Sequence, residues 1–353
     1  MTNRWWTCGL EYFFDDRKFQ IKNPKWVGLS VLAYMFAVGV ATAYAQQPAK
    51  LPKIGHVTGS SRTGKDLDPH IQAFRQRLKE LGYVEGKNLA IEYRYVDGKG
   101  PAAEADHARD LVRLNVDVLV LGAYPSIRAA KEATKTIPIV MVSGNDPVAF
   151  GLIDSLARPG GNITGISQLA RELSGKRLEL LLEMIPNLSR VGLLMTNESI
   201  NAKYVLKQYE EAARGLKLEP RAIEIRNDSP DLPTAFDTAL KARVDAMVPI
   251  RNSTINLLVP RIAQLAVKRR MPTMFERNGA AENGGLASYT ADELESYRRA
   301  AVYVDKILKG SKPADLPVEQ ASKFELAINL KTAKQIGVTI PPHVLTRADK
   351  VIR

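Results

Sequence analysis

The stretch VDVLVLGAYPSIRAAKEATKTIPIVMVS (116–143) decides the fold class. It opens with an apolar run at 116–122 that only Asp117 interrupts, continues with a helical pattern from Ser126 to Lys135, and ends with a second apolar run at 137–143. Apolar runs without polar alternation are typical of strands in a parallel sheet whose two faces are both covered by helices. The stretch therefore predicts a strand, a helix and a parallel strand in an α/β protein.

The same alternation extends on both sides of this stretch. A Gly-rich segment, RPGGNITGIS (158–167), interrupts it and indicates either a tight connection or a hinge, because Gly residues punctuate regular structure. Two similar α/β halves result, and they predict two lobes that face each other across a cleft. The expected strands are 53–58, 88–96, 190–196, 218–225, 244–250, 272–276, 286–290 and 324–330, and the expected helices are 67–81, 102–115, 169–185, 205–216, 231–242, 258–265, 294–308 and one at the C-terminus.

An apolar run near the N-terminus, VGLSVLAYMFAVGVATA (27–43), contains no charged residue. Basic residues precede it, and Ala43-Tyr44-Ala45 follows it. This order is that of a secretory signal peptide, so we expect 1–45 to be removed after Ala45 and the remaining chain to be soluble in the periplasm. An uncleaved membrane anchor is the alternative, because 17 residues are at the lower limit of a membrane span. The unusually long basic segment leaves the true translation start open.

Composition and charge exclude several classes of protein. The chain has 353 residues, with 50 Lys or Arg and 38 Asp or Glu, so the formal charge is 50 − 38 = +12. Apolar residues make up 45% and charged residues 25%, which are the values of a globular protein and not of a disordered chain. The basic residues are dispersed, and the longest run is Lys268-Arg269-Arg270, so we expect no nucleic-acid partner. The single cysteine, Cys8, excludes an internal disulfide.

The motifs of common catalytic and cofactor sites are missing from the sequence. No strand is followed by G-x-G-x-x-G or by a P-loop, and H-E-x-x-H does not occur. The four histidines lie far apart in sequence, and His56, within the first strand, is best explained as a core residue. Ser167 lacks the second Gly of a nucleophile elbow, which favours a role as a hydrogen-bond donor. The sequence thus predicts a binding protein with no catalytic residue, cofactor or metal.

Polar side chains follow the expected strands in both halves. In open α/β sheets, ligands bind at the carboxyl ends of the strands. Hydroxyl groups and helix N-termini there suit a carboxylate, and Asp146 or Glu276 suits an ammonium group, although Asp146 before Pro147 also fits a helix N-cap. Tyr124 and Tyr289 are placed to flank an apolar or aromatic group. The candidate ligand-binding residues are Ser60, Ser61, Tyr124, Ser126, Ser143, Asn145, Asp146, Ser167, Asn197, Arg251, Asn252, Glu276, Ser288 and Tyr289.

Three long segments resemble a known family. They are 137–167, 284–310 and 312–342, beginning IPIVMVSGNDP, GGLASYTADEL and KPADLPVEQAS respectively. They are similar to the substrate-binding components of ABC importers, in particular to uncharacterised and tryptophan-type receptors with the type I periplasmic-binding fold. The resemblance implies two Rossmann-like lobes with parallel sheets, joined by three hinge crossings and closing over one small molecule. The N-terminal lobe would comprise 52–164 plus about 290–320, and the C-terminal lobe 165–289 plus about 321–353.

The resemblance also bears on the site and on the hinge. Asn145, Asp146 and Ser167 match the family's first-lobe loop and first crossing, and 324–329 matches the last crossing. Rigid-body closure would then bend the chain near Gly165, Ser288 and Phe324. The chain departs from the family's usual pattern in three places that touch the expected pocket: at Asn197-Glu198 in place of Asn-Pro, at Thr290 in place of Gly, and at Ile250-Arg251, where an Asp is common.

These observations together predict an extracytoplasmic receptor of an ABC importer. Its ligand would be an amino acid, an aromatic compound or another small carboxylate. Its partners would be the membrane permease and the ATPase, and we expect a monomer. A receptor for a sensor kinase or chemoreceptor would have the same fold, and a periplasmic α/β enzyme is a further alternative. The sequence leaves the ligand and the choice between transport and signalling open.

Overall fold

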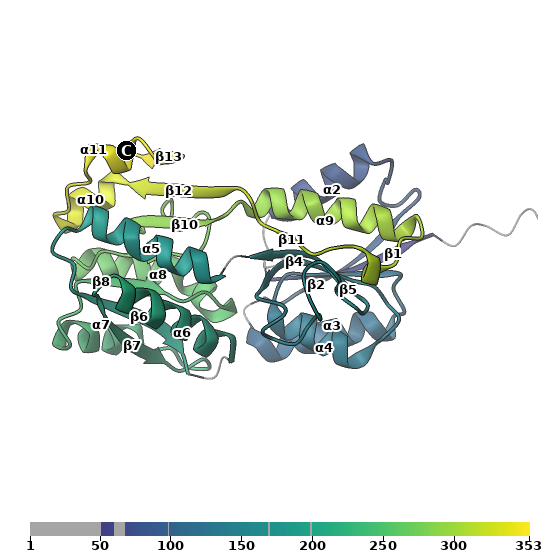
Figure 1. Cartoon of the computed structure of the whole chain (residues 1–353), viewed down its shortest axis with the longest axis horizontal. Helices are drawn as coiled ribbons and strands as arrows, with labels where there is room; N and C mark the ends of the chain where they lie inside the picture. Colours follow the sequence, from purple (N-terminus) through teal and green to yellow (C-terminus); the bar gives the residue numbers. More distant parts are fainter. Residues whose placement is uncertain (1–50, 60–67, 98, 169, 198–199) are drawn as a thin grey trace, which may run out of the picture. The chain divides into compact units, whose positions relative to one another are not determined.

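The first lobe is built on a six-stranded parallel sheet with the strand order β11-β5-β4-β3-β1-β2 (Figure 1). The computed structural model describes residues 51–59, 68–97, 99–168, 170–197 and 200–353. The expected leader and Glu198 lie outside these ranges. The strands are β1 (Lys53–Thr58), β2 (Ala90–Tyr95), β3 (Val118–Leu121), β4 (Ile139–Asn145), β5 (Ile163–Gln168) and β11 (Glu319–Gln320).

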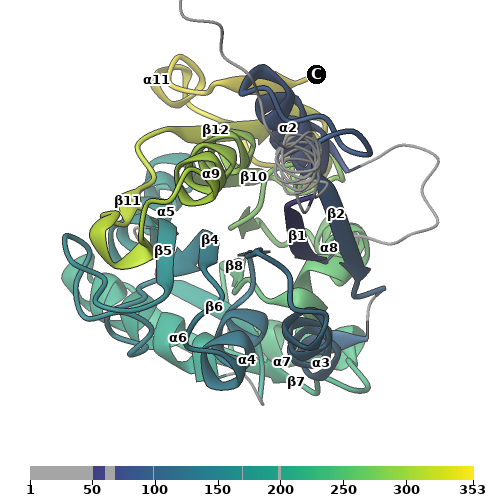
Figure 2. The ribbon, with the colours of Figure 1, turned by 90° about the vertical axis from the view of Figure 1, so that its right-hand side faces the viewer.

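Helices cover both faces of this sheet, as its apolar strands predict. Val118 and Val120 pack in one core with residues of α2 and α9, whereas Leu119 and Leu121 pack in a second core with residues of α3 and α4. Successive side chains of a strand point to opposite faces, so an unbroken apolar strand supplies both cores. Figure 2 shows these helix pairs on the two sides of the sheet. The helices are α2 (Pro69–Glu80), α3 (Gly100–Arg113), α4 (Tyr124–Ala133) and α9 (Glu293–Leu308).

The second lobe contains a three-stranded parallel sheet of order β7-β6-β8 and a four-stranded sheet of order β13-β12-β10-β9. A bridge between Met247 and Thr273 joins β8 to the segment before β9, so the two sheets adjoin. β10 and β12 are antiparallel. The strands are β6 (Arg190–Thr196), β7 (Glu219–Ile225), β8 (Ala246–Pro249), β9 (Met274–Phe275), β10 (Ala287–Ala291), β12 (Phe324–Asn329) and β13 (Lys350–Ile352).

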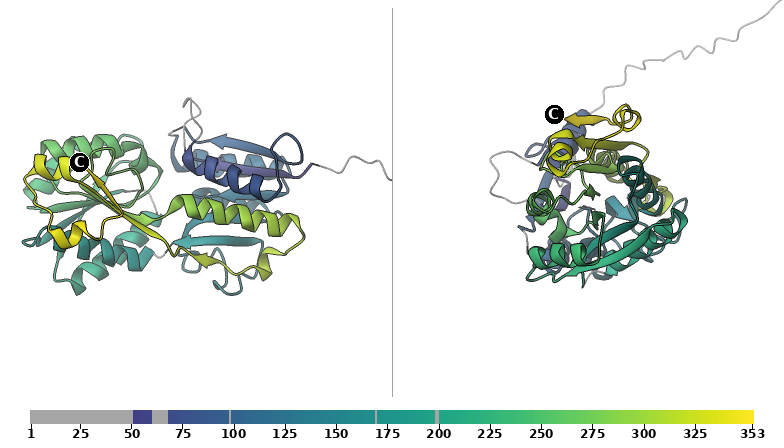
Figure 3. Two further views of the ribbon diagram at one scale, coloured as in Figure 1. Left: turned by 90° about the horizontal axis from the view of Figure 1, so that it is seen from above. Right: turned by 90° about the vertical axis from the view of Figure 1, so that its left-hand side faces the viewer.

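The second lobe also has a core on each face of its sheets. Leu178 of α5 and Tyr209 of α6 belong to one core, which includes residues of the C-terminal helices α10 and α11, and Phe236 of α7 and Ile262 of α8 belong to the other. Figure 3 shows these helices around the strands. The helices are α5 (Ala170–Met184), α6 (Ile200–Gly215), α7 (Leu232–Lys241), α8 (Ser253–Lys268), α10 (Leu330–Ile336) and α11 (Pro342–Leu345).

The chain passes between the lobes after β5, after β10 and after β11. The second passage carries α9 back to the first lobe, where it packs beside α2 (Figure 3). Next to it runs the third passage, because Ala291 pairs with Phe324 and the Asp292 amide donates to the Lys323 carbonyl at 2.9 Å. The fold class predicted from the sequence is confirmed. Within the described ranges, no helix is long and apolar enough to cross a membrane.

The Gly-rich segment 158–167 differs from a simple break between lobes, because β5 is a full strand of the first sheet. Gly165 has φ 125°, and a Cβ atom at this position would lie 2.2 Å from the Met141 carbonyl oxygen of β4. Only glycine permits this approach of two strands. The predicted lobe boundary between 164 and 165 therefore falls inside β5. The short elements α11 and β13 are too brief to give a periodic signal and were not predicted.

Candidate functional site

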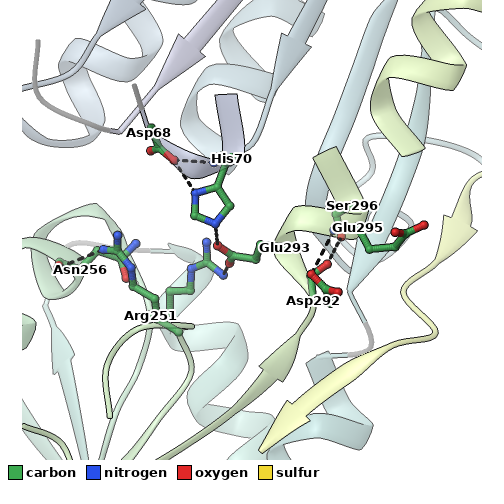
Figure 4. A network of polar contacts seen from close by, with 9 residues as sticks. Asp68, His70, Arg251, Asn256, Asp292, Glu293, Glu295 and Ser296 are labelled. Carbon is green, nitrogen blue, oxygen red and sulfur yellow. Dashed lines mark hydrogen bonds and ion pairs between the residues drawn. The ribbon is translucent and has the colours of Figure 1, made fainter. Parts of the chain in front are cut away.

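The two lobes meet at Glu293, the first residue of α9. Asp292 caps this helix by accepting a hydrogen bond from the Glu295 amide at 3.0 Å. The Glu293 carboxylate accepts a hydrogen bond from the Arg251 guanidinium, which comes from the second lobe directly after β8. Its other oxygen lies 3.2 Å from His70 Nε2 on α2 of the first lobe. Glu293 thus joins residues of both lobes (Figure 4).

His70 is held between two carboxylates at the start of α2. Asp68 is the N-cap of this helix, and its Oδ1 accepts from the His70 amide at 2.8 Å and lies 2.6 Å from His70 Nδ1. Burial by itself would lower the pKa of His70, but the bonds to Asp68 and Glu293 raise it to about 9. His70 is therefore a cation at neutral pH. Within the described part of the chain, no group of His, Cys, Asp and Glu residues has the arrangement needed to hold a metal ion.

Glu293 remains ionised although it is only 8% exposed. Burial would raise its pKa, but the nearby Arg251 and the bond from His70 hold that pKa at about 2. Tyr297, one turn along α9, has its ring 5.3 Å from that of His70 and 5.9 Å from that of His56. The pKa of Tyr297 is raised, first by burial and then by Glu293, so its hydroxyl stays protonated.

His56 is the core residue that the sequence predicted. It is fully buried in β1, and its Nδ1 lies 2.8 Å from the Val120 carbonyl oxygen. Burial lowers the pKa of His56, which keeps the ring neutral. Its ring packs near those of Phe74, Tyr93 and Tyr297, so the first lobe presents an aromatic group beside the charged cluster.

Two arginines of the second lobe lie at the ends of neighbouring strands. Arg251 follows β8, and its amide donates to Glu276 Oε2 at 2.7 Å. Arg277 follows β9 and donates to the Asn256 carbonyl oxygen at 3.2 Å (Figure 4). Burial and, next to it, the charge of Arg251 lower the pKa of Arg277. No ion pair joins Arg277 to a carboxylate of the described residues.

Glu276 has a different environment from the one that the sequence suggested for an ammonium partner. It pairs with Arg177 of α5 at 2.8 Å and accepts from the Tyr209 hydroxyl at 2.6 Å. Arg177 also donates to the Tyr289 carbonyl oxygen at 2.7 Å. Both carboxylate oxygens of Glu276 therefore have partners inside the second lobe. The bonds of Arg177 to Glu276 and to Tyr289 hold the ends of β9 and β10 against α5.

Two further polar contacts join the lobes. The Tyr204 hydroxyl of α6 donates to Asp146, whose other oxygen accepts from the Ala149 amide at 3.1 Å, as a helix cap does. Phe150 lies between Tyr124 and Tyr204, with ring centroids at 4.7 and 4.8 Å.

The other contact connects α8 with α3 of the first lobe. Ser253 donates to Glu104, which is 2% exposed. Burial raises the pKa of Glu104, and only the bond from Ser253 opposes this shift.

The remaining predicted residues are distributed over strand ends and helix caps. Asn252 caps α8 by accepting from the Ile255 amide at 2.8 Å and donates to Thr196 Oγ1 at 2.7 Å. The Ser126 hydroxyl donates to the Ala123 carbonyl oxygen at 2.7 Å within the first turn of α4. Asn197 is exposed.

Five of the predicted residues lie on β4, β5 and β10. Ser167 and Ser288 are buried, and the Tyr289 ring stacks on Phe324 at 6.0 Å. Ser143 and Asn145 lie at the end of β4. Ser60 and Ser61 lie outside the described residues.

The sequence analysis did not select Asp68, His70, Arg277 or Glu293. The sequence did contain a usable signal. Asp68-Pro69-His70 is an N-cap followed by Pro at the first helical position of α2, and Asp292-Glu293 begins α9, which covers the same face of the first sheet. What the signal cannot give is the pairing, because these residues meet only after the chain has returned to the first lobe.

A surface hollow of about 300 Å³ lies elsewhere, between α2 and the edge strand β2. Its walls include Arg75 and Glu85, which pair with each other at 2.9 Å. No predicted site residue lines it, so we assign no ligand to it.

The fold and the polar residues at the strand ends define the class of protein to which this chain belongs. The molecule has the type I periplasmic-binding fold, as in a conserved domain protein of Vibrio cholerae (30% identity, 86% of this chain and 100% of that chain, TM-score 0.77). It is also similar to an ABC domain from Streptococcus pneumoniae in complex with L-Trp (28% identity, 85% and 99% covered, TM-score 0.75). A curated relative is a tyrosine-binding protein of Clostridioides difficile, 27% identical over 272 residues, or 77% of each chain.

The family model described as ABC transporter substrate binding protein matches residues 63–352. The chain therefore belongs to this family. Its members are substrate-binding components and not enzymes, and they are in general extracytoplasmic. The family predicted from the sequence, and with it a solute receptor of an ABC importer, is confirmed.

Proposed function

We propose that the chain captures one small molecule between its two lobes and delivers it to the permease and ATPase of an ABC importer. One observation carries this proposal: Glu293 joins His70 of the first lobe to Arg251 of the second, at the carboxyl ends of the strands. Ligands of open α/β sheets bind at such ends. Contacts that link two lobes also bias the equilibrium between open and closed arrangements.

The ligand we propose is a small carboxylate, including an amino acid or an aromatic acid. Cationic groups and helix N-termini at the strand ends suit its carboxylate, and rings such as Tyr297 suit an apolar side chain. Relatives named for tyrosine binding or solved with L-Trp support a ligand of this size.

The cellular setting remains part of the proposal. We propose that the leader is cleaved after Ala45 and that the mature chain is a periplasmic monomer. N-terminal sequencing of the protein from a periplasmic extract should begin at Gln46. An intact leader in the membrane fraction would contradict this step.

A thermal-shift screen of the mature chain against amino acids, aromatic acids and small dicarboxylates tests the receptor function. A ligand at 100 times its Kd stabilises the folded state by about 2.7 kcal/mol. We expect at least one compound to do so and to reduce the radius of gyration in small-angle scattering, with bending near Gly165, Ser288 and Phe324. A panel without any stabilising compound would count against the receptor function.

A further inference from the structure

Among the described residues, the charges at the contact between the lobes do not cancel. Three cations, His70, Arg251 and Arg277, face two carboxylates, Asp68 and Glu293, which leaves one formal positive charge. His70 lies against both carboxylates, and Arg251 donates to Glu293. Within the same described residues, Arg277 donates to the neutral Asn256 carbonyl oxygen at 3.2 Å and pairs with no carboxylate. In this set of five residues the surplus charge therefore belongs to Arg277.

Glu293 and Asp68 attract Arg277 through space but are bonded to Arg251 and His70. Three other acidic groups of the described residues pair with neither Arg277 nor a free ammonium group. Glu276 is taken by Arg177 and Tyr209. Asp146 accepts from the Tyr204 hydroxyl and from a backbone amide. Glu104 keeps one buried oxygen without a partner, but its burial disfavours the charged form that an ammonium group would need.

An arginine in this position favours an anion. A guanidinium group stays protonated in proteins, so Arg277 cannot relieve its partial burial by losing a proton. Its charge is further opposed by Arg251, the neighbour at the next strand end. Five N–H donors in a planar fork match the two oxygens of a carboxylate. A carboxylate bound there would supply the missing negative charge.

Building on the proposed receptor function, we propose that Arg277 binds the anionic group of the ligand and that this chain prefers a carboxylate without an ammonium group over the matching amino acid. The ligand class is then a small organic acid. The carboxylate of an amino acid would compensate Arg277 as well, but its ammonium group would leave the site with one uncompensated positive charge.

Two ligand pairs that differ only in the ammonium group test this preference: 3-phenylpropanoate with L-phenylalanine, and 4-methylpentanoate with L-leucine. We expect calorimetry to give at least one of the two acids an affinity about tenfold or more above that of its amino acid. Arg277→Gln should lose about tenfold or more of that affinity. The control Arg261→Gln removes the same charge from an exposed position on α8 and should change nothing. Tighter binding of either amino acid, binding of neither acid, or an unchanged affinity in Arg277→Gln would overturn the proposal.

A measurement without ligand separates binding from a structural role. Arg277→Gln removes no ion pair of the described residues and relieves the repulsion by Arg251, so the ligand-free variant should unfold at the same or a higher temperature. A fall in Tm of about 4 °C or more would assign Arg277 to the fold instead. If an amino acid or a neutral compound binds in place of the acids, the anion preference fails while the receptor function stands. If nothing in the wider screen binds, the receptor function itself fails.

Discussion

The second lobe and the contact between the lobes each contain a charged cluster, and the two differ in how completely their bonds are satisfied. The buried ionic cluster consists of Arg177, Tyr209 and Glu276, which lie on α5, on α6 and after β9. Arg177 and Glu276 are only 4% and 6% exposed, and each has partners inside the same lobe.

The interlobe cluster consists of Asp68, His70, Arg251, Arg277 and Glu293. It draws on both lobes and leaves one cation without a charged partner among the described residues. Similar residue types thus serve different purposes. Complete pairing within one lobe holds strand ends in place, whereas incomplete pairing between lobes leaves capacity for a ligand and for movement.

The largest effect is expected from the buried ionic cluster. Glu276→Ala leaves the Arg177 guanidinium buried without its counter-charge, and such a loss costs about 3–5 kcal/mol of the free energy of unfolding. Urea denaturation followed by circular dichroism measures it. As a control, Glu219→Ala removes exposed ion pairs with Arg190 and Arg221 and should cost about 1 kcal/mol or less. Similar costs for the two variants would remove the contrast on which the comparison rests.

A smaller, pH-dependent effect is expected from the interlobe cluster. The pKa of His70 in the folded state, about 9, is above its ordinary value of 6.5. The stabilisation by His70 is therefore fully present below about pH 6.5 and is lost as the pH rises towards 9, with a magnitude of about 3 kcal/mol. Asp68 and Glu293 face His70 directly, and Arg251 and Arg277 act on it through Glu293.

His70→Gln provides the reference for this titration. The difference in unfolding free energy between wild type and His70→Gln should shrink between pH 6 and pH 9.5, as measured by urea denaturation at each pH. Tyr297 does not titrate in this window because its pKa is raised. A difference that stays constant over this range would show that folding does not shift the pKa of His70.

The smallest effect is expected at Asp146, which also joins the lobes. It caps the turn at 147–150, where no helix follows, by accepting from the Ala149 amide. Asp146→Ala should cost about 0.5–2 kcal/mol of stability and leave ligand affinity nearly unchanged. Tyr204→Phe removes the hydroxyl group that donates to Asp146. It therefore measures how much of the lost stability comes from the hydrogen bond between the lobes. Weakening of ligand binding by about tenfold or more in Asp146→Ala would instead make Asp146 an ammonium partner and place it in the ligand site.

The local pattern of apolar and polar residues was sufficient to predict most of the strands and helices. The apolar runs at 116–122 and 137–143 are within a few residues of β3 and β4, because a strand buried on both faces has no alternative to apolar side chains. The Gly-rich segment left a tight connection and a hinge open. Gly165 is needed for the close approach of β5 to Met141, and in sequence this requirement looks the same as a hinge.

The sequence by itself determined the α/β class, the order of strands and helices, the family and the strand ends where polar groups gather. Only the tertiary structure decided which of these groups are partners. In sequence, Glu276 gave no sign that α5 brings Arg177 against it. The local signals at His70 and Glu293 did not show that these two residues are partners, because they meet only when α9 returns beside α2. Ion pairing depends on distance in space, and periodicity in a sequence records only which face of its own element a residue occupies.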